Sequence, residues 1–258
     1  MSGHENWQLQ IVKSATSTSD LARMAAETGK PGKAAFLAIE QTAGRGRHGR
    51  HWSSQKGGMY LSVLLRPKIT KTRWFGYSFV AALAVADVVS GCIANHVPKK
   101  DRPETGLKWP NDVLVDGGKI AGILLEAQQD SLIIGSGVNI ALLDTVPDGR
   151  FAPVALASFL PSGCPLPTPE ELAAVYLKRL ERWSGLLEEE GFAPIRAAWL
   201  ERAVFRGKLV EVTRHETVTR GIFTDLQTDG TMLLLDDLGK THHITTGDVQ
   251  LLGDYECF

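Results

Sequence analysis

The segment between residues 108 and 126 constrains the fold of this chain more than any other. Two apolar runs, 108–115 and 119–126, flank the short linker Asp116-Gly117-Gly118. Asp-Gly and Gly-Gly pairs supply the positive φ angles that tight hairpin turns require. The sequence therefore predicts an antiparallel hairpin built from these two runs.

Five further short segments have the length and apolar character of strands: 9–13, 35–40, 59–65, 131–134 and 138–141. The last two are separate runs around Gly135 and Gly137. Nearly continuous apolar runs are typical of strands that are covered on both faces. We therefore expect a sheet buried between other layers of structure.

The longest apolar segment, 74–96, predicts a helix. Its most apolar part, 79–93, is interrupted by Asp87, Ser90 and Gly91. It is too short and too mixed to span a bilayer. A buried helix explains this segment best.

Three shorter helices have recognisable ends. Hydroxyl residues at 17–19 precede a short helix that ends at Gly29, and Thr168-Pro-Glu-Glu is a capping box. The helix that follows this box has Gly191 as its stop, and another helix covers 195–204.

The pattern changes after Phe205. Five short strand-like runs follow, at 209–212, 219–223, 232–235, 242–245 and 249–252. This is the rhythm of a small five-stranded barrel. We place a domain boundary near Arg206, which divides the chain into residues 1–205 and 206–258.

Charge is balanced overall but uneven along the chain. The net charge of -1 gives no global reason to expect a DNA or membrane partner. No acidic residue lies between Glu40 and Asp87, so this stretch suggests a local anion site. Its basic residues are Arg45, Arg47, Arg50, Lys56, Arg66, Lys68, Lys71 and Arg73.

Cysteine usage and the first residues bear on location. Cys92, Cys164 and Cys257 are far apart and form neither a disulfide framework nor a zinc motif. Residues 1–10 are polar and contain no apolar signal region. We expect a reducing, cytoplasmic setting.

The loop Gly44-Arg-Gly-Arg-His-Gly-Arg50, followed by Trp52, is the strongest chemical feature. Glycines let the backbone approach a ligand, and arginines add permanently charged planar donors that suit phosphate. No acidic residue nearby in the sequence competes for these arginines. The loop is either a phosphate- or carboxylate-binding loop or an arginine-rich surface loop that binds RNA weakly.

Two other segments carry weaker signals. Lys108-Trp-Pro-Asn-Asp112 places Asn111 and Asp112 at the start of an apolar run, where they reach a ligand or bond the turn. Lys119 opens an apolar strand, and we expect Gly122 to lie on the same face and to leave space there. A charged residue that protects a hairpin edge is the alternative.

The remaining signals favour ordinary structural roles. Gly135-Ser-Gly-Val-Asn139 lacks the third glycine of a dinucleotide motif, so a tight turn is expected. The pairs His48/His51 and His242/His243 do not form a convincing metal site, because the second pair alternates across a strand. No catalytic serine or cysteine motif is present.

Four motifs occur in order: residues 41–52, 108–112, 118–126 and 135–139. Together they resemble the biotin–protein ligase family, and the resemblance extends from about Leu9 to Leu252. It implies an α+β fold: a mixed sheet with flanking helices, similar to class II aminoacyl-tRNA synthetases. A small SH3-like C-terminal β-barrel follows this sheet in the family.

The resemblance also implies site residues. Lys119 and Arg47 match catalytic positions, and Asn111 matches a position near the nucleotide phosphates and Mg²⁺. Positions that contact biotin or its activated form are Ser17, Thr18, Ser19, Gln41, Arg45, Gly46, Arg47 and Lys119. Positions that contact ATP or the adenylate are Arg45, Arg47, Arg50, Trp52, Lys108, Asn111 and Lys119.

Two residues depart from the family pattern. Ser19 stands where members often have Asn, and His48 stands where Arg is common. No helix-turn-helix pattern precedes the first strand, so the repressor function of longer relatives is not expected.

The implied reaction joins biotin to a lysine of a biotin carboxyl carrier protein of acetyl-CoA carboxylase. Biotin's carboxylate attacks the α-phosphate of ATP, and Arg45, Arg47, Lys119 and Mg²⁺ offset the repulsion between the two anions. A closing loop shields the biotinyl-5'-AMP until the lysine arrives.

Two alternatives and the oligomeric state stay open. A lipoate–protein ligase has a similar fold and reaction, although the arginine loop and Lys-Trp-Pro-Asn-Asp favour biotin. A non-catalytic RNA-binding module is a different class, which the isoelectric point of about 6.7 disfavours. A homodimer is compatible with the sequence, but no feature specifies it.

Overall fold

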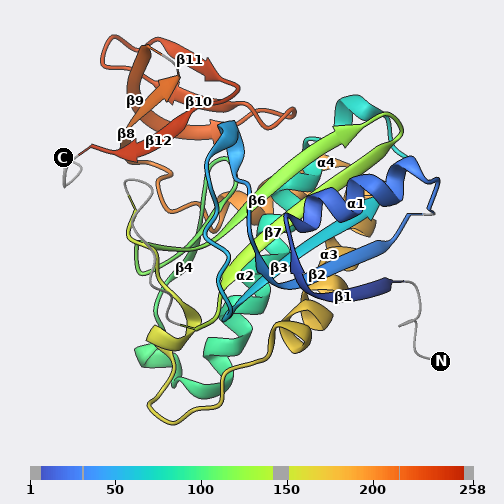
Figure 1. The fold of residues 1–258 in the computed structure, drawn as a ribbon. Coiled ribbons are helices and arrows are strands. Elements are labelled where there is room, and N and C mark those ends of the chain that lie inside the picture. Colours follow the sequence, from blue (N-terminus) through green and yellow to red (C-terminus); the bar gives the residue numbers. More distant parts are fainter. Residues whose placement is uncertain (1–6, 31, 142–150, 215, 253–258) are drawn as a thin grey trace.

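The computed structural model describes residues 7–30, 32–141, 151–214 and 216–252. A seven-stranded mixed sheet forms the centre, in the order β1-β2-β3-β7-β6-β5-β4 (Figure 1). β1 and β2 are parallel and the other neighbours are antiparallel. The strands are β1 (Gln8–Ala15), β2 (Ala34–Gln41), β3 (Gly58–Leu65), β4 (Thr105–Lys108), β5 (Asp112–Val115), β6 (Gly118–Gln128) and β7 (Ser131–Asn139).

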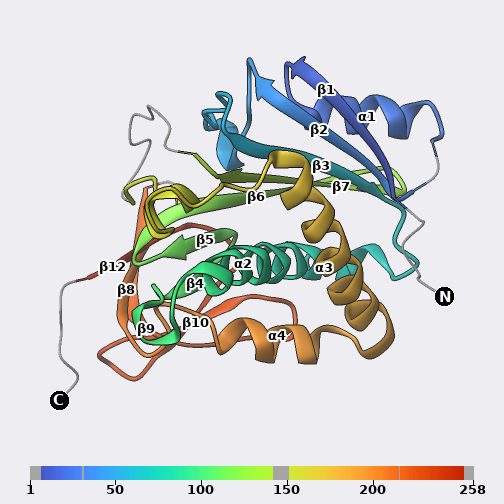
Figure 2. The ribbon, with the colours of Figure 1, turned by 90° about the horizontal axis from the view of Figure 1, so that it is seen from below.

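Helices cover both faces of this sheet, as its apolar strands predict. Figure 2 shows α1 (Thr18–Glu27) on one side and α2 (Gly76–His96) and α3 (Pro169–Glu190) on the other. Alternate residues of β2 follow this division. Phe36 packs in a small cluster with α1, whereas Leu37 joins the main core on the opposite face, where α3 contacts β2. The fold is therefore α+β, as expected.

α2 is the buried helix that the sequence predicts. Among the described residues it is the one helix long and apolar enough to cross a membrane by length and composition. However, 67% of its most apolar window is buried inside the protein. Its contacts with α3 and the sheet account for its apolar composition.

Local end signals work as predicted at α3. The side chain of Thr168 accepts from the Glu171 amide at 3.1 Å, and the Glu171 carboxylate accepts from the Thr168 amide at 2.9 Å. Gly191 ends the helix with φ of 84°, a conformation that favours glycine. The short helix α4 (Phe192–Leu200) follows directly.

Two predicted strands differ from the structure. The segments around Gly135 and Gly137 form one strand, β7, because both glycines stay extended and pair with neighbours on either side. The predicted strand 108–115 divides into β4 and β5, which are joined by a turn that contains a cis Trp109–Pro110 bond. The predicted hairpin therefore consists of β5 and β6.

The C-terminal part forms a five-stranded antiparallel sheet, in the order β11-β10-β9-β8-β12. All five predicted runs are strands. The C-terminal sheet packs on the first sheet and on α4. The Trp109 indole of the β4–β5 turn donates to the Gly230 carbonyl at 3.1 Å, and Trp199 of α4 contacts Phe223 edge-on. The strands are β8 (Leu209–Arg214), β9 (Thr217–Leu226), β10 (Met232–Leu235), β11 (Thr241–Ile244) and β12 (Asp248–Leu251).

Candidate active site

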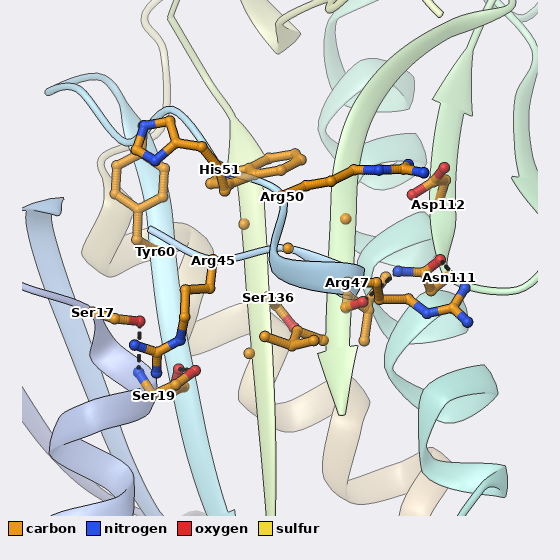
Figure 3. A pocket seen from close by; sticks show the side chains of 18 of the residues that line it. Ser17, Ser19, Arg45, Arg47, Arg50, His51, Tyr60, Asn111, Asp112 and Ser136 are labelled. Atoms are coloured by element: carbon orange, nitrogen blue, oxygen red, sulfur yellow. Dashed lines mark hydrogen bonds between the residues drawn. The ribbon is translucent and has the colours of Figure 1, made fainter. Parts of the chain in front are cut away.

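One pocket brings together every site residue that the sequence predicts. It lies between the start of α1, the arginine-rich loop and the ends of β5 and β6. Figure 3 shows Ser17, Ser19 and Arg45 gathered at one end and Arg47 and Asn111 at the other. The predicted residues in its lining are Ser17, Thr18, Ser19, Gln41, Arg45, Gly46, Arg47, Arg50, Trp52, Lys108, Asn111 and Lys119.

Buried hydroxyl groups form the first end of the pocket. Ser17 caps α1 by accepting from the Ser19 amide, and it is only 3% exposed. The Thr18 hydroxyl lies 2.7 Å from the hydroxyl of Ser62, which in turn lies 3.2 Å from the hydroxyl of Ser19. Gln41 accepts from the Thr18 amide at 2.7 Å. This network presents a neutral polar surface.

Ser62 is a site residue that sequence reasoning missed. It is fully buried in the middle of β3, where all its neighbours are apolar. A buried hydroxyl in such a run must find a polar partner. That requirement is a signal that the sequence alone carries.

The arginine-rich loop has a defined shape. The Gly46 amide donates to the Arg50 carbonyl at 2.8 Å, and the Trp52 amide donates to the Gly44 carbonyl at 2.9 Å. A Cβ at Gly44 would lie 2.4 Å from the Ser54 hydroxyl, so this position requires glycine. His48, at the tip, has φ of 57°, is exposed and does not line the pocket.

Acidic residues from distant segments contact two of the loop arginines. Arg45 makes a bidentate ion pair with Asp20 of α1, at 2.7 and 3.1 Å, which holds the pKa of Asp20 below its ordinary value. Arg50 pairs with Asp248 of β12. The expectation that no acidic residue competes for the loop was therefore wrong, because tertiary contacts bring the carboxylates in.

Arg47 differs from both neighbours. It is half-buried and donates to the Thr246 hydroxyl at 2.9 Å and to the Asn111 amide oxygen at 3.4 Å. It forms no ion pair with any described residue. Burial lowers its pKa, yet an arginine stays charged in proteins. Arg47 thus carries a positive charge that pairs directly with no described carboxylate, although Asp112 and Asp248 lie close enough to attract it.

Two lysines flank a buried carboxylate at the second end. Asp112 lies 3.0 Å from the Lys108 ammonium and 2.8 Å from the Lys119 ammonium. Burial alone would raise the pKa of Asp112, but the two lysines outweigh burial and lower it. One carboxylate between two ammonium groups leaves a net positive charge here. Sequence reasoning placed both lysines in the site and named Asp112 as able to reach a ligand or bond the turn, but it did not predict that Asp112 pairs with the two lysines.

A bulge places Lys119 and Gly122 on one face. They are three residues apart, so regular alternation would put them on opposite faces. The pairing of β5 and β6 shifts register between Val113 and Leu114, which absorbs one extra residue of β6. Lys119 and Gly122 therefore share a face as expected, but the Trp52 ring fills the space that Gly122 leaves.

Trp52 covers a platform of two glycines. Gly122 of β6 and Gly137 of β7 are direct partners, and a Cβ on either would lie within 3.1 Å of the Trp52 ring. The Lys119 ammonium lies 5.3 Å from the ring centre. The glycines of 135–139 therefore allow close approach rather than a tight turn. The Trp52 indole nitrogen is buried, and none of the described residues is its hydrogen-bond partner.

In this conformation the pocket holds only about 80 Å³ of free space. Small-molecule sites usually enclose roughly 300–1,000 Å³. The pocket in this conformation is therefore smaller than a substrate of ordinary size requires.

No group of three or more metal-ligating side chains occurs among the described residues. Of the carboxylate and amide oxygens in the pocket, those of Asn111 and Asp112 already contact Arg47, Lys108 and Lys119. This donor set suits a Mg²⁺ ion that arrives as part of a nucleotide substrate, because such ions keep most of their waters and phosphate ligands.

Residues 11–139 match the Biotin/lipoate A/B protein ligase family. The biotin–[acetyl-CoA-carboxylase] ligase of Mycobacterium tuberculosis is 36% identical, with 94% of this chain and 88% of that protein covered. The ligase of Paracoccus denitrificans with the same name is 35% identical, with 82% and 88% covered. The biotin protein ligase of Aquifex aeolicus, solved with biotin and ATP, superposes with a TM-score of 0.80 at 26% identity. The superposition covers 95% of this chain and 99% of the Aquifex aeolicus chain.

Proposed function

Because this chain belongs to the Biotin/lipoate A/B protein ligase family, we propose how its pocket performs the ligase reaction. The chain is a biotin–[acetyl-CoA-carboxylase] ligase that forms biotinyl-5'-AMP from biotin and ATP. One observation carries the assignment of roles: a neutral hydroxyl-lined end faces a positively charged end in a single pocket. Biotin has the matching form, with a neutral ring system and an anionic carboxylate.

The neutral ring system of biotin binds at the hydroxyl end. Ser17, Thr18 and Ser19, with Gln41, offer donors and acceptors in a buried setting. Ser62 holds two of these hydroxyls in place. A site built from buried polar groups discriminates against ligands that leave those groups unpaired.

The carboxylate of biotin meets ATP at the charged end. An oxygen of the carboxylate attacks the α-phosphorus, the bond to the β-phosphate oxygen breaks, and pyrophosphate leaves. Arg47 and Lys119 stabilise the negative charge that develops on the phosphate, and Asn111 orients Arg47. Arg45, which Asp20 neutralises, anchors the loop to α1 instead. A Mg²⁺ ion bound to ATP would supply positive charge to the phosphates.

Transfer to the carrier needs no covalent enzyme intermediate. The amine of the acceptor lysine attacks the acyl carbon, and AMP leaves with the former carboxylate oxygen. Lys119 stabilises the departing phosphate, and Trp52 excludes water from the anhydride. We propose a biotin carboxyl carrier protein as the acceptor, in keeping with the names of the related ligases.

We also retain the division into residues 1–205 and 206–258 as a proposal. The change from a mixed to a purely antiparallel sheet near Arg206 supports it. The cytoplasm is the proposed location, because it supplies ATP and a reducing environment for free cysteines such as Cys92.

Lipoate is the alternative substrate that the family description allows. The names of the relatives at 35–36% identity favour biotin. RNA binding as the main function has no support beyond the arginines, two of which are held in ion pairs.

The decisive experiment measures pyrophosphate release from Mg²⁺–ATP, with biotin or lipoate added separately and a carrier domain present or absent. Release that depends on biotin, with biotin on the carrier lysine, supports the proposal. Release with lipoate alone would move the chain to the lipoate branch of the family, and release with neither would leave the binding-module alternative.

A further inference from the structure

A second cavity opens from the active site towards the C-terminal sheet. It shares Arg47, Pro110, Asn111 and Ile123 with the active-site pocket. Its volume is about 330 Å³, and its other walls come from the start of α2, the β4–β5 turn and the β9–β10 turn. The roles proposed above leave it unused.

The walls of this cavity are aromatic. Phe75, Phe79 and Trp109 line it, and Ser78 stands between the two phenylalanines on the first turn of α2. The β9–β10 turn packs directly on them, since a Cβ at Gly230 would lie 2.9 Å from Phe79 and 3.0 Å from Phe75. These contacts fix the position of the turn.

A single carboxylate, Asp229, lines the cavity on this turn. It accepts from the Thr231 amide at 2.9 Å, and this contact lowers the pKa of Asp229 below its ordinary value. Asp229 forms no ion pair with any described residue. The cavity thus combines apolar walls with the carboxylate of Asp229 on one side and the cation of Arg47 at the end that it shares with the active-site pocket.

We propose that this cavity is the route by which the acceptor lysine of the carrier protein reaches the acyl-adenylate. A lysine has a long apolar stem and a cationic end, which match the aromatic walls and Asp229. A nucleotide triphosphate matches less well, because Arg47 is the one cation among the described lining residues and Asp229 lies in the same cavity. The inference rests on the proposed function and specifies where the second substrate enters.

The route is consistent with the chemistry of transfer. The ammonium group meets Asp229 at the cavity wall and loses a proton to water before it attacks. The amine lone pair forms the bond to the acyl carbon, the acyl–oxygen bond breaks, AMP leaves, and the amide nitrogen releases its second proton to water. Arg47 and Asn111, at the inner end of the route, are the residues that face the phosphate.

The test separates the two half-reactions. Adenylation is followed by biotin-dependent pyrophosphate release, and transfer by single-turnover loading of the carrier domain from preformed enzyme-bound biotinyl-AMP. Asp229→Asn should raise the carrier concentration for half-maximal transfer by roughly fivefold, the upper range for an exposed ion pair. Asp229→Lys should raise it further. Adenylation should stay within twofold of the parent rate in both variants.

Ser78→Phe provides a second, steric test. The larger ring would fill the cavity from the helix side and should slow transfer to the carrier by at least about tenfold.

Hydroxylamine is small and uncharged, so its reaction with the bound adenylate should be nearly unaffected by either Asp229 variant. Asp237→Asn is the matched control, because this exposed carboxylate lies on the next turn and does not line the cavity.

Unchanged carrier transfer in both Asp229→Lys and Ser78→Phe would overturn the inference. A raised KM for ATP with unaltered transfer would also overturn it and assign the cavity to the nucleotide. If the parent enzyme itself released no pyrophosphate with biotin, the proposed function would fail instead, so the two failures are distinguishable.

Discussion

The guanidinium of Arg47 donates to the hydroxyl of Thr246 across 2.9 Å, although the two residues are 199 positions apart. Thr246 belongs to the turn between β11 and β12, so the C-terminal sheet directly contacts a proposed catalytic residue. A neutral acceptor orients the cation without cancelling its charge. An aspartate at this position would orient Arg47 equally well but would weaken its attraction for phosphate.

The first prediction follows from this contact. Thr246→Val keeps the shape of the side chain but removes the acceptor, so Arg47 loses its orientation. We expect kcat for adenylation to fall about tenfold, because a hydrogen bond to a charged group contributes roughly 1.5 kcal/mol. Thr246→Ser should restore most of the rate. Equal activity of the valine and serine variants would show that the contact has no role in positioning.

The second prediction compares two arginines of the same loop. Arg47→Gly removes a charge that pairs directly with no described carboxylate, so bound biotinyl-AMP should dissociate about a hundredfold faster, consistent with a buried charged contact. Arg50→Gly removes an arginine whose ion pair with Asp248 is largely exposed. This variant should release bound biotinyl-AMP only about threefold faster than the parent. Rapid filtration of enzyme with labelled adenylate measures both rates. Similar rates in the two variants would contradict the distinction.

The third prediction concerns Lys119 and its partner Asp112. Lys119→Ala should lower adenylate formation by at least about a hundredfold, since a preorganised donor at a developing negative charge contributes roughly 3 kcal/mol. Pre-steady-state pyrophosphate release measures this rate. A near-normal rate would remove Lys119 from the mechanism.

Asp112→Asn tests the same cluster through stability. The variant leaves the ammonium of Lys108 buried without a counter-charge, which should cost about 3 kcal/mol of unfolding free energy at neutral pH. The pKa of Asp112 is lower in the folded state than in the unfolded chain, where it is about 3.9. Ionised Asp112 therefore contributes fully to the free energy of unfolding above about pH 3.9, and this contribution is lost as the pH falls through the lowered pKa. The parent and the variant should therefore differ in their free energy of urea unfolding by a constant amount above about pH 4, and this difference should become smaller only below that pH. A difference that is constant from pH 7 to pH 3 would contradict this account.

Local patterns predicted most of the fold. The Asp-Gly-Gly turn, the capping box at Thr168 and the stop at Gly191 are specified by neighbouring residues, so the sequence carries them directly. The twelve predicted site residues could also be found from local sequence, because each belongs to a short motif or to a hydroxyl-rich helix start. The resemblance grouped them, and the structure places them around one pocket.

The missed features depend on contacts between distant segments. Asp20 and Asp248 pair with loop arginines from 25 and 198 residues away, and no local pattern announces such pairs. Gly137 was expected in a turn because glycine is common there. Its actual role, close approach of Trp52 to an extended strand, depends on a loop 85 positions earlier in the chain.

The last prediction uses that close approach. In Gly137→Ala the new methyl group would lie 2.5 Å from the Trp52 indole nitrogen, so the ring must leave the glycine platform. If Trp52 encloses biotin, KM for biotin should rise about tenfold, as expected when a well-packed aromatic contact is lost. Gly185→Ala in α3 is the matched control, because its Cβ meets no atom within 4 Å and should leave KM unchanged.

A double-mutant cycle identifies the cause of that effect. In a Trp52→Ala background the clash partner is absent, so Gly137→Ala should add little to the KM for biotin. The two changes would then be strongly non-additive, as contacting residues are. Full additivity would mean that the methyl group acts on biotin itself, and Trp52 would lose its proposed role as the cover of the site.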